Sequence, residues 1–496
     1  MIVSRFRYSI AAVLLLCLFP GILASFLPIT PHQELLGWGM MGCAGILLLL
    51  WSVLLILRKL PEWGHRVFWW GAGYFLRFGY ILRFPYYQMQ HDVRTFEDTD
   101  GHAGYIAYLY HEGHLPDFDV REVWQFYHPP LHHALCAGWM HLLDALHLPE
   151  EQIFEGVQVL PFTYSCLMLA VFALLLGHFE LKGAAFVIPF SIMALHPSQI
   201  ILAGSLNNDM LSILFMGASL LLTLRWYREP KTGTLIGLAL TIGLGMFTKL
   251  SAWMTAPAAA ALFLLKLIND PKGQRCKRLM QYVLFGVICI PIGLFWSARN
   301  YLGWEVPPSY IPMLADDSAQ YVGNHPIWER LFDLSPHQFR YIYDCYEIYG
   351  QDYSEYNPFI GLLKTAVFDE FVGTKRFPAV TGVGEVLFWT QVLLVVLTIL
   401  AGIRLLHQKG LDPEKLALLV TYGVTLVSYV SFCIAYPHTC TQSFRYAVPT
   451  LYTSLLFLGI WIGTGTKPKP LRIAAGSVTG IFLAASFAVY GVLLYV

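Results

Sequence analysis

The chain has 496 residues, of which 56% are hydrophobic and 13% are charged. Soluble domains carry about 25% charged residues, so a chain this apolar needs lipid to cover its surface. Its 32 basic and 32 acidic residues give a formal net charge of zero, which excludes the strongly basic surface typical of nucleic-acid binding. We therefore expect an all-α polytopic membrane protein.

Thirteen apolar stretches have about the length that a helix needs to cross a bilayer. The first one, after Arg5 and Arg7, resembles a signal peptide. Because no A-x-A site precedes polar sequence and a second apolar run starts almost at once, we expect it to be retained as a span. The predicted spans are residues 8–27, 35–57, 66–84, 153–177, 183–203, 206–227, 233–248, 250–267, 279–297, 384–406, 416–436, 446–463 and 471–494.

Lysine and arginine are concentrated in alternate short loops, which favours the cytoplasm for those loops. With a cytoplasmic N-terminus, residues 58–66, 266–278 and 467–472 are cytoplasmic. Two long segments, 85–152 and 298–383, then lie on the opposite side. We expect an integral, multi-pass protein of a bacterial plasma membrane, with these two segments facing outside.

The first long external segment is predicted to carry two short interfacial helices. Residues 125–147 are long enough to span the membrane but too polar, and residues 102–113 show helical spacing of apolar side chains. Both patterns favour amphipathic helices that lie in the interface. In the longer helix the apolar face holds Leu131, Leu135, Trp139, Leu142 and Leu146, and the opposite face holds His133, Met140, Asp144 and His147.

The second long external segment, residues 298–383, is predicted to be a small external insertion or cap. Within it, residues 341–356 contain six tyrosines among acidic residues. Aromatic faces and acidic acceptors suit sugar surfaces, and an ordinary packed cap is the plainer alternative. The chain thus divides into three parts: an N-terminal transmembrane module at 1–297, this cap at 298–383, and C-terminal transmembrane helices at 384–496. The first external segment of the N-terminal module, residues 85–152, carries the candidate site.

Ionisable residues at membrane depth are costly and are functional candidates by default. His91 and Asp92 follow the third predicted span, which places Asp92 at the mouth of any central cavity. A carboxylate there could act as a general base on a hydroxyl, and a solvated loop carboxylate is the alternative. Tyr127 and His128 precede two prolines that fix the entry into the interfacial helix. His128 then lies near a helix N-terminus, where an anionic group is favoured.

Four more polar residues flank predicted spans on the same side. Asn208 and Asp209 bracket an external turn, and because Asp209 opens a helix, a simple N-cap is the alternative to a functional role. Lys249 and Arg445 lie at outer span ends with no short-loop carboxylate beside either. Cations at this position suit a lipid-linked phosphate, and snorkelling toward headgroups is the alternative.

Histidine and cysteine patterns assign no metal site. Nine of the 17 histidines lie between His91 and His147, but the ligand spacing of a zinc site is absent, so no metal ligands are named and a divalent metal requirement stays open. Most of the nine cysteines lie in apolar runs, as buried thiols do. Cys345 and Cys440 fall outside the spans and form the candidate disulfide pair.

Taken in their order along the chain, these motifs resemble those of the GT-C membrane glycosyltransferases. The resemblance is to family 39, which includes the protein O-mannosyltransferases and the aminoarabinose transferase of lipid A. The likeness rests on Asp92 after an early span, an aromatic-x-P-P-L segment, an Asn-Asp turn, a T-K pair and an R-Y-x-x-P motif. It covers about residues 66–300 well, the C-terminal spans weakly and residues 298–383 hardly at all.

The resemblance implies a GT-C-like fold and transfer of one sugar from a polyprenyl-phosphate donor to an acceptor on the non-cytoplasmic face. It assigns the catalytic base to Asp92 and places Asp209 in the same cavity. Two departures matter. The Asp-Glu pair of relatives is Asp92-Val93 here, which leaves Asp98 and Asp100 as secondary acidic candidates, and a lysine before Pro-Pro is replaced by His128.

The expected partners are the polyprenyl-phosphate sugar, the lipid bilayer, and a lipid, protein or polysaccharide acceptor, with no nucleic acid. No nucleotide cofactor is expected, because the chain lacks a Gly-rich phosphate loop. Two other functional classes are alternatives. A transporter or flippase of lipid-linked sugar would distribute polar groups through its spans and often carry inverted repeats, and a non-catalytic assembly subunit would use the external segments only for binding.

Overall fold

The structure is a computed structural model that describes residues 2–27, 32–339, 342, 355–373, 375–407, 410, 412–464 and 469–496. Within these residues the regular secondary structure is helical, apart from one isolated bridge between Tyr321 and His438, and loops join the helices. Eight helical stretches are long and apolar enough to cross a membrane, which fits an integral multi-pass membrane protein. They are His32–Ile56, Glu150–His178, Asp209–Arg228, Leu250–Asn269, Lys272–Trp304, Pro378–Leu406, Pro413–Ala435 and Ile473–Tyr495.

Each of the other five predicted spans also coincides with a helix. Four of these have apolar stretches shorter than 18 residues, and α3 carries four charged residues. The predicted total of thirteen spans therefore stays a prediction. The five helices are α1 (Ile2–Ser25), α3 (Glu62–Arg83), α8 (Ala184–Leu195) with the short α9 (Pro197–Ile201), α11 (Thr232–Thr248) and α18 (Val448–Gly463).

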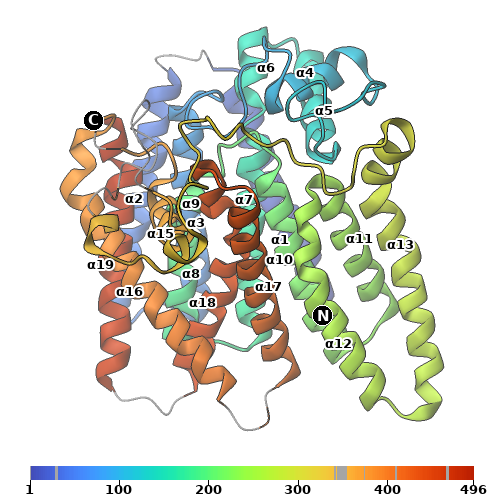
Figure 1. Ribbon diagram of the computed structural model, residues 1–496. Coiled ribbons are helices and arrows are strands. Elements are labelled where there is room, and N and C mark those ends of the chain that lie inside the picture. The colour runs from blue at the N-terminus through green and yellow to red at the C-terminus, as the bar shows by residue number, and fades with distance from the viewer. Residues whose placement is uncertain are drawn as a thin grey trace.

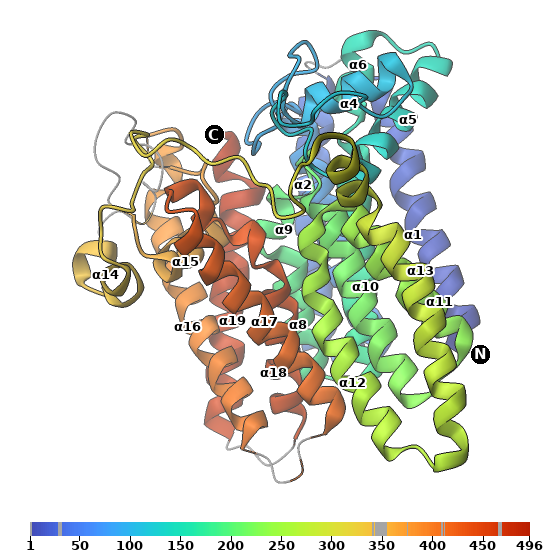
Figure 2. The same ribbon diagram turned by 45° about the vertical axis from the view of Figure 1, so that its right-hand side comes forward.

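The long helices run roughly parallel and form two neighbouring groups (Figures 1 and 2). The green and yellow helices of one group meet the orange and red helices of the other where α12 packs against α17. The remaining elements of the bundle are α2 (His32–Ile56), α6 (Glu150–Gly156), α7 (Val159–His178), α10 (Asp209–Arg228), η1 (Leu250–Thr255), α12 (Ala256–Asn269), α13 (Lys272–Trp304), α16 (Thr381–Leu406), α17 (Pro413–Ala435) and α19 (Lys469–Gly491).

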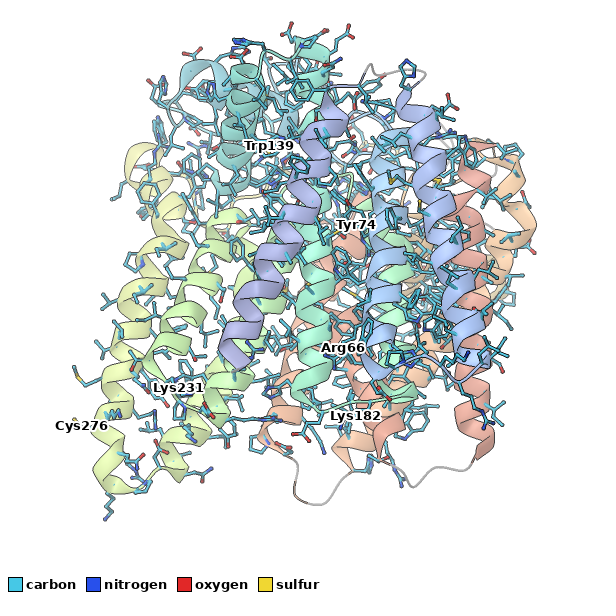
Figure 3. All side chains as sticks on the ribbon, turned by 180° about the vertical axis from the view of Figure 1, so that it is seen from behind. Arg66, Tyr74, Trp139, Lys182, Lys231 and Cys276 are labelled. Carbon is cyan, nitrogen blue, oxygen red and sulfur yellow. The ribbon has the colours of Figure 1, made fainter. Side chains whose placement is uncertain are left out.

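The predicted loop sides agree with the arrangement of the bundle. Figure 3 shows Arg66, Lys182 and Lys231 toward one end of the bundle and Trp139 at the other. Helices α4 (Gly101–Glu112) and α5 (Leu131–Ala145) cover that second end. The loops predicted to be cytoplasmic therefore gather opposite the first external segment.

Both short helices predicted in the first external segment form, while their position at the membrane interface stays a prediction, and one face of α5 was assigned wrongly. Leu135, Leu142 and Leu146 are exposed, and they are free to contact the membrane interface. His133 and Met140, which the sequence analysis placed on a polar face, are completely buried. The reason is that α5 packs against α4 and α6, so the side opposite the leucines faces protein instead of water.

A break between α8 and α9 is stabilised by a buried arginine that the sequence analysis did not single out. Pro197 has no N–H, so the carbonyl of Met193 lacks its helical donor. Arg77, which is fully buried, donates to the carbonyls of Met193 (3.3 Å) and Ala194 (2.5 Å) and to the hydroxyl of Ser165 (2.8 Å). A cation therefore lies inside the bundle and not only near its outer end. Its role is structural, because it donates to carbonyls at the helix break.

The second external segment is not a separate cap throughout. Its helix α15 (Pro358–Phe368) has a buried apolar face and packs against α9 and α16. Asn357 caps α15 by accepting from the N–H of Phe359 (2.9 Å). The tyrosine-rich stretch at 341–356 and Cys345 fall almost entirely outside the described residues, so the sugar-surface and disulfide predictions stay predictions.

Candidate functional site

A cavity of about 320 Å³ lies at the end of the bundle that α4 and α5 cover. Residues from both helix groups form it, because one wall comes from η1 and α13 and another from α17 and the segment before α18. Its lining has a charged and polar part around Asp92 and a part with several large apolar side chains. The polar part holds Asp92, His102, Tyr127, His128, Lys249 and Arg445, and the apolar part includes Leu250, Trp253, Met254, Ile311 and Phe432.

Two carboxylates and two cations form a chain of ion pairs beside this cavity. Arg445 contacts Asp92 at 3.0 Å (Nη2 to Oδ2) and Asp209 at 3.6 Å (Nη1 to Oδ2). Lys249 donates to the other carboxylate oxygen of Asp209. Asp209 is therefore held between two cations, and Arg445 joins Asp209 to Asp92. Four residues that the sequence analysis selected independently come together in one network.

The backbone of Asp92 is fixed in an unusual conformation. The N–H of His102, in the first turn of α4, donates to the Asp92 carbonyl at 3.0 Å, and the N–H of Ala103 donates to the Val93 carbonyl at 2.9 Å. Asp92 has φ = 60° and Arg94 has φ = 61°, in the left-handed region that costs a non-glycine residue of order 1–3 kcal/mol. Such strain persists only where surrounding structure imposes it, and here it directs the Asp92 carboxylate toward Arg445.

The contacts of the cations and of Asp209 argue against the alternatives left open by the sequence. Lys249 and Arg445 have no carboxylate beside them in the sequence, yet both pair with Asp209. Their pairing and the burial of Arg445 also argue against snorkelling to headgroups. Asp209 is not an N-cap, because its own N–H is satisfied by the side chain of Asn207 (3.0 Å) and its carboxylate contacts the cations. Sequence neighbours could not reveal these pairs, since the partners come from different helices.

Asn208 supports the site without lining the cavity. Its side-chain N–H donates to the carbonyl of Thr248 at 3.0 Å, which is the last residue of α11. Lys249 follows directly in an extended conformation. Asn208 therefore stabilises the end of the helix from which Lys249 reaches Asp209.

His91 lies behind Asp92 in a buried cluster with two acidic residues that the sequence analysis missed. Its Nε2 is 2.6 Å from Asp369 and its Nδ1 is 3.3 Å from Glu370. Burial by itself lowers the pKa of His91, but the carboxylates of Asp369 and Glu370 outweigh burial and raise that pKa to about 10. The ligand atoms of the three residues lie within 4.8 Å of one another, a donor set that could also hold a metal ion.

Tyr127 and His128 both line the cavity and belong to a group of neighbouring aromatic rings. The indole N–H of Trp296 donates to the Tyr127 carbonyl at 2.9 Å. The His128 ring stacks on His102 at 5.2 Å, and His102 shares a hydrogen bond of 2.9 Å with His133. Burial, together with nearby cations, holds the pKa of His102 and of His128 well below the usual value. These imidazoles are therefore neutral hydrogen-bonding groups at pH 7.

The secondary acidic candidates do not reach the cavity. Asp98 accepts from the N–H and hydroxyl of Thr95, both at 2.9 Å, and Asp100 pairs with Arg94 at 3.0 Å. Neither residue is among those that line the cavity. They stabilise the loop that carries Asp92.

Tyr446 is a further residue that the sequence analysis did not select. Its ring lies 4.7 Å from the Arg445 guanidinium and 5.0 Å from the Lys249 ammonium, and its hydroxyl accepts from Arg445 at 2.6 Å. Its place in the R-Y-x-x-P motif was the available signal. Aromatic faces attract cations, so Tyr446 helps to hold both cations at the cavity wall.

No protein-family model and no curated protein matches this chain. The chemistry of the site must therefore be argued from its own residues. It combines a partly exposed carboxylate, two cations beside one cavity and neutral imidazoles, next to an apolar wall. Such a set can bind an anionic group attached to an apolar chain and can accept a proton from a hydroxyl.

Proposed function

We propose that this protein is a membrane glycosyltransferase. In this proposal it transfers a sugar from a polyprenyl-phosphate donor to a lipid, protein or polysaccharide acceptor, at the outer face of a bacterial plasma membrane. The observation that carries the proposal is the network Asp92–Arg445–Asp209–Lys249 beside a cavity with an apolar wall. The GT-C-like fold and the outward orientation belong to the same proposal, and the gathering of basic loops at the opposite end supports the orientation.

Asp92 is the general base in this mechanism. Its carboxylate is the more exposed of the two in the network, with 33% of its side-chain surface exposed against 3% for Asp209, so an acceptor hydroxyl can approach it. Asp92 takes the hydroxyl proton as the acceptor oxygen forms a bond to the anomeric carbon. The bond from that carbon to the donor phosphate oxygen breaks at the same time, and its electron pair leaves with the phosphate.

Arg445 and Lys249 stabilise the negative charge that grows on the departing phosphate. Because the nucleophile and the leaving group occupy opposite faces of the sugar, one displacement inverts the anomeric configuration, as in single-displacement glycosidases. Asp209 keeps both cations in place between turnovers. The apolar wall, from Trp253 to Phe432, suits the first isoprenoid units of the donor.

The proposal is tested by turnover with purified protein in detergent. The protein is incubated with radiolabelled polyprenyl-phosphate sugars of several kinds, and release of polyprenyl phosphate is measured together with label on acceptor. Mass spectrometry of the lipids that copurify with the protein selects the donors to try. We expect transfer from at least one donor, with inversion of the anomeric centre by NMR.

The same preparation separates the enzyme from its alternatives. A transporter or flippase, reconstituted in vesicles, would move lipid-linked sugar between leaflets without breaking the glycosidic bond. A non-catalytic subunit would bind donor or acceptor and do neither. Either result, with the copurifying lipid supplied as donor, would refute the proposed reaction.

A further inference from the structure

One short helix of the second external segment exposes an unusual amount of apolar surface. Helix α14 (Ile327–Phe332) and the residue two positions after it leave large apolar side chains uncovered: Ile327 is 54% exposed, Trp328 69%, Phe332 76% and Leu334 64%. Trp328 and Phe332 are four residues apart, so they share one face of the helix. Isolated exposed apolar residues are ordinary, but a contiguous group marks an interaction surface.

The opposite face of α14 fixes its position relative to the bundle. Arg330 is 3% exposed and donates to the carbonyl of Cys433 at 2.6 Å. That carbonyl lies in the last turn of α17, and its helical donor would be the N–H of residue 437, which is a proline and has none. Arg330 thus provides the missing donor and attaches α14 to the end of α17.

Backbone contacts reinforce this attachment. The N–H of Val322 donates to the Pro437 carbonyl at 2.8 Å, and the N–H of Thr439 donates to the Gln320 carbonyl at 2.9 Å. These bonds join the stretch before α14 to the stretch after α17. The height of α14 along the bundle is therefore set by where α17 ends.

The end of α17 is the expected level of the membrane surface. Helix α17 has 23 residues, about 34 Å at 1.5 Å per residue, which is close to the thickness of a bilayer's hydrocarbon core. In Figure 2, α14 projects sideways from the bundle beyond α15 and α16 instead of rising above it. Its exposed face is thus directed outward at interface depth.

The surface around α14 continues into the side of the bundle. Phe339, shortly after α14, contacts Trp389 of α16 with ring centroids 5.6 Å apart. Trp389 is itself exposed, as are Val386 and Leu393 on the same helix, and α16 belongs to a predicted membrane span. Tryptophan is enriched at membrane–water interfaces, where its ring is half in apolar surroundings.

We propose that α14 is a membrane anchor: Ile327, Trp328, Phe332 and Leu334 insert into the headgroup region of the outer leaflet beside α16 and α17. Burial of apolar side chains in the acyl boundary drives such insertion. The anchor holds α14 against the bilayer, and the chain leads back from α14 to the cavity wall at Ile311. This inference does not depend on the chemistry of the site.

A fluorescent label tests the anchor. Cys43 and Cys276, the exposed thiols among the described residues, are replaced by serine, and Trp328→Cys is labelled with an NBD group in lipid vesicles. We expect blue-shifted emission, strong quenching by nitroxide lipids and slow reaction with dithionite. Asp317→Cys, an exposed position in the same segment, is the matched control and should be red-shifted and rapidly reduced.

Two results would overturn the proposal. If position 328 is as accessible to dithionite as position 317, the face is open to water. If its protection disappears when protein is diluted into excess lipid, a second copy of the chain covers α14 and lipid does not. Protection that persists on dilution, with quenching by nitroxide lipids, supports the anchor. Since the label replaces an exposed side chain, folding is checked by gel filtration of both variants.

Discussion

Replacing Asp92 by asparagine should lower the rate of the reaction much more than it lowers the stability of the fold. The change keeps the side-chain volume and removes the charge. Asp92 is one-third exposed, and its pair with Arg445 has a length of 3.0 Å; pairs of this kind contribute about 0–1 kcal/mol to stability. Loss of a general base lowers turnover by about 10²–10⁴, which corresponds to about 2.7–5.4 kcal/mol of transition-state stabilisation at 1.36 kcal/mol per tenfold. The expected effect on rate therefore exceeds the expected effect on stability.

Asp209→Asn is the matched comparison, and the structure reverses its expected pattern. From the sequence, this variant was expected to be milder than Asp92→Asn if Asp209 only caps its helix or positions substrate. Asp209 is 3% exposed and contacts both Lys249 and Arg445, so its neutralisation leaves two cations without their shared carboxylate. Breaking a buried pair in this way costs about 3–5 kcal/mol. We expect Asp209→Asn to lower thermal stability more than Asp92→Asn and turnover less per folded molecule.

The assay combines three measurements on each purified variant. Melting is followed by circular dichroism, donor affinity by titration calorimetry, and chemistry by single-turnover release of polyprenyl phosphate. The reasoning fails if Asp92→Asn is folded, binds donor and transfers sugar at close to the wild-type rate. Asp209 would then be tested as the base, before Asp98 and Asp100, which lie away from the cavity.

Three further predictions concern the cations, the topology and the histidine. Replacing Lys249 or Arg445 by methionine should raise the donor KM more than it changes acceptor use, with Lys231→Met at the opposite end as control; unchanged donor kinetics in both variants would exclude phosphate binding. A cysteine introduced at Ser318 should react with impermeant reagents from outside only, and labelling from inside would invert the topology. Because the folded-state pKa of His91 is raised to about 10, its stabilising charge is fully present below pH 6.5 and is lost as the pH rises toward 10. The difference in melting temperature between wild type and His91→Gln should therefore shrink from pH 6.5 to 10, and a constant difference would refute the ion cluster.

The sequence predicts the helices well because hydrophobic length is a local property. Every predicted span coincides with helical residues, including those at 66–84 and 233–248, although the span at 183–203 is divided between α8 and α9. The distribution of lysine and arginine also predicts which ends of the helices lie on the same side. For that reason Asp92, Asp209, Lys249 and Arg445 could be selected as neighbours of one surface before any contact was known.

The sequence did not predict which charged residues pair or which side chains are buried, because both depend on which helices pack together. Asp369 is 278 residues from His91, and no local pattern joins the two. Arg77 lies inside the predicted span 66–84, and its role depends on the carbonyls of Met193 and Ala194, which belong to a different helix. His133 and Met140 were assigned to the polar face of the helix. Helical periodicity shows which residues share a face, but it does not show which other helices pack against that face.

The Asp92–Arg445 pair has a consequence for how the protein is made. Its partners are separated by 353 residues, which a ribosome needs about 20–70 s to translate at 5–20 residues per second. Asp209 and Lys249 are added within that interval, but the cation that joins Asp209 to Asp92 is not yet synthesised. The electrostatic network can close only when the segment before α18 docks against the earlier helices. A chain halted before residue 445 would therefore contain both carboxylates and Lys249 without the arginine that links them.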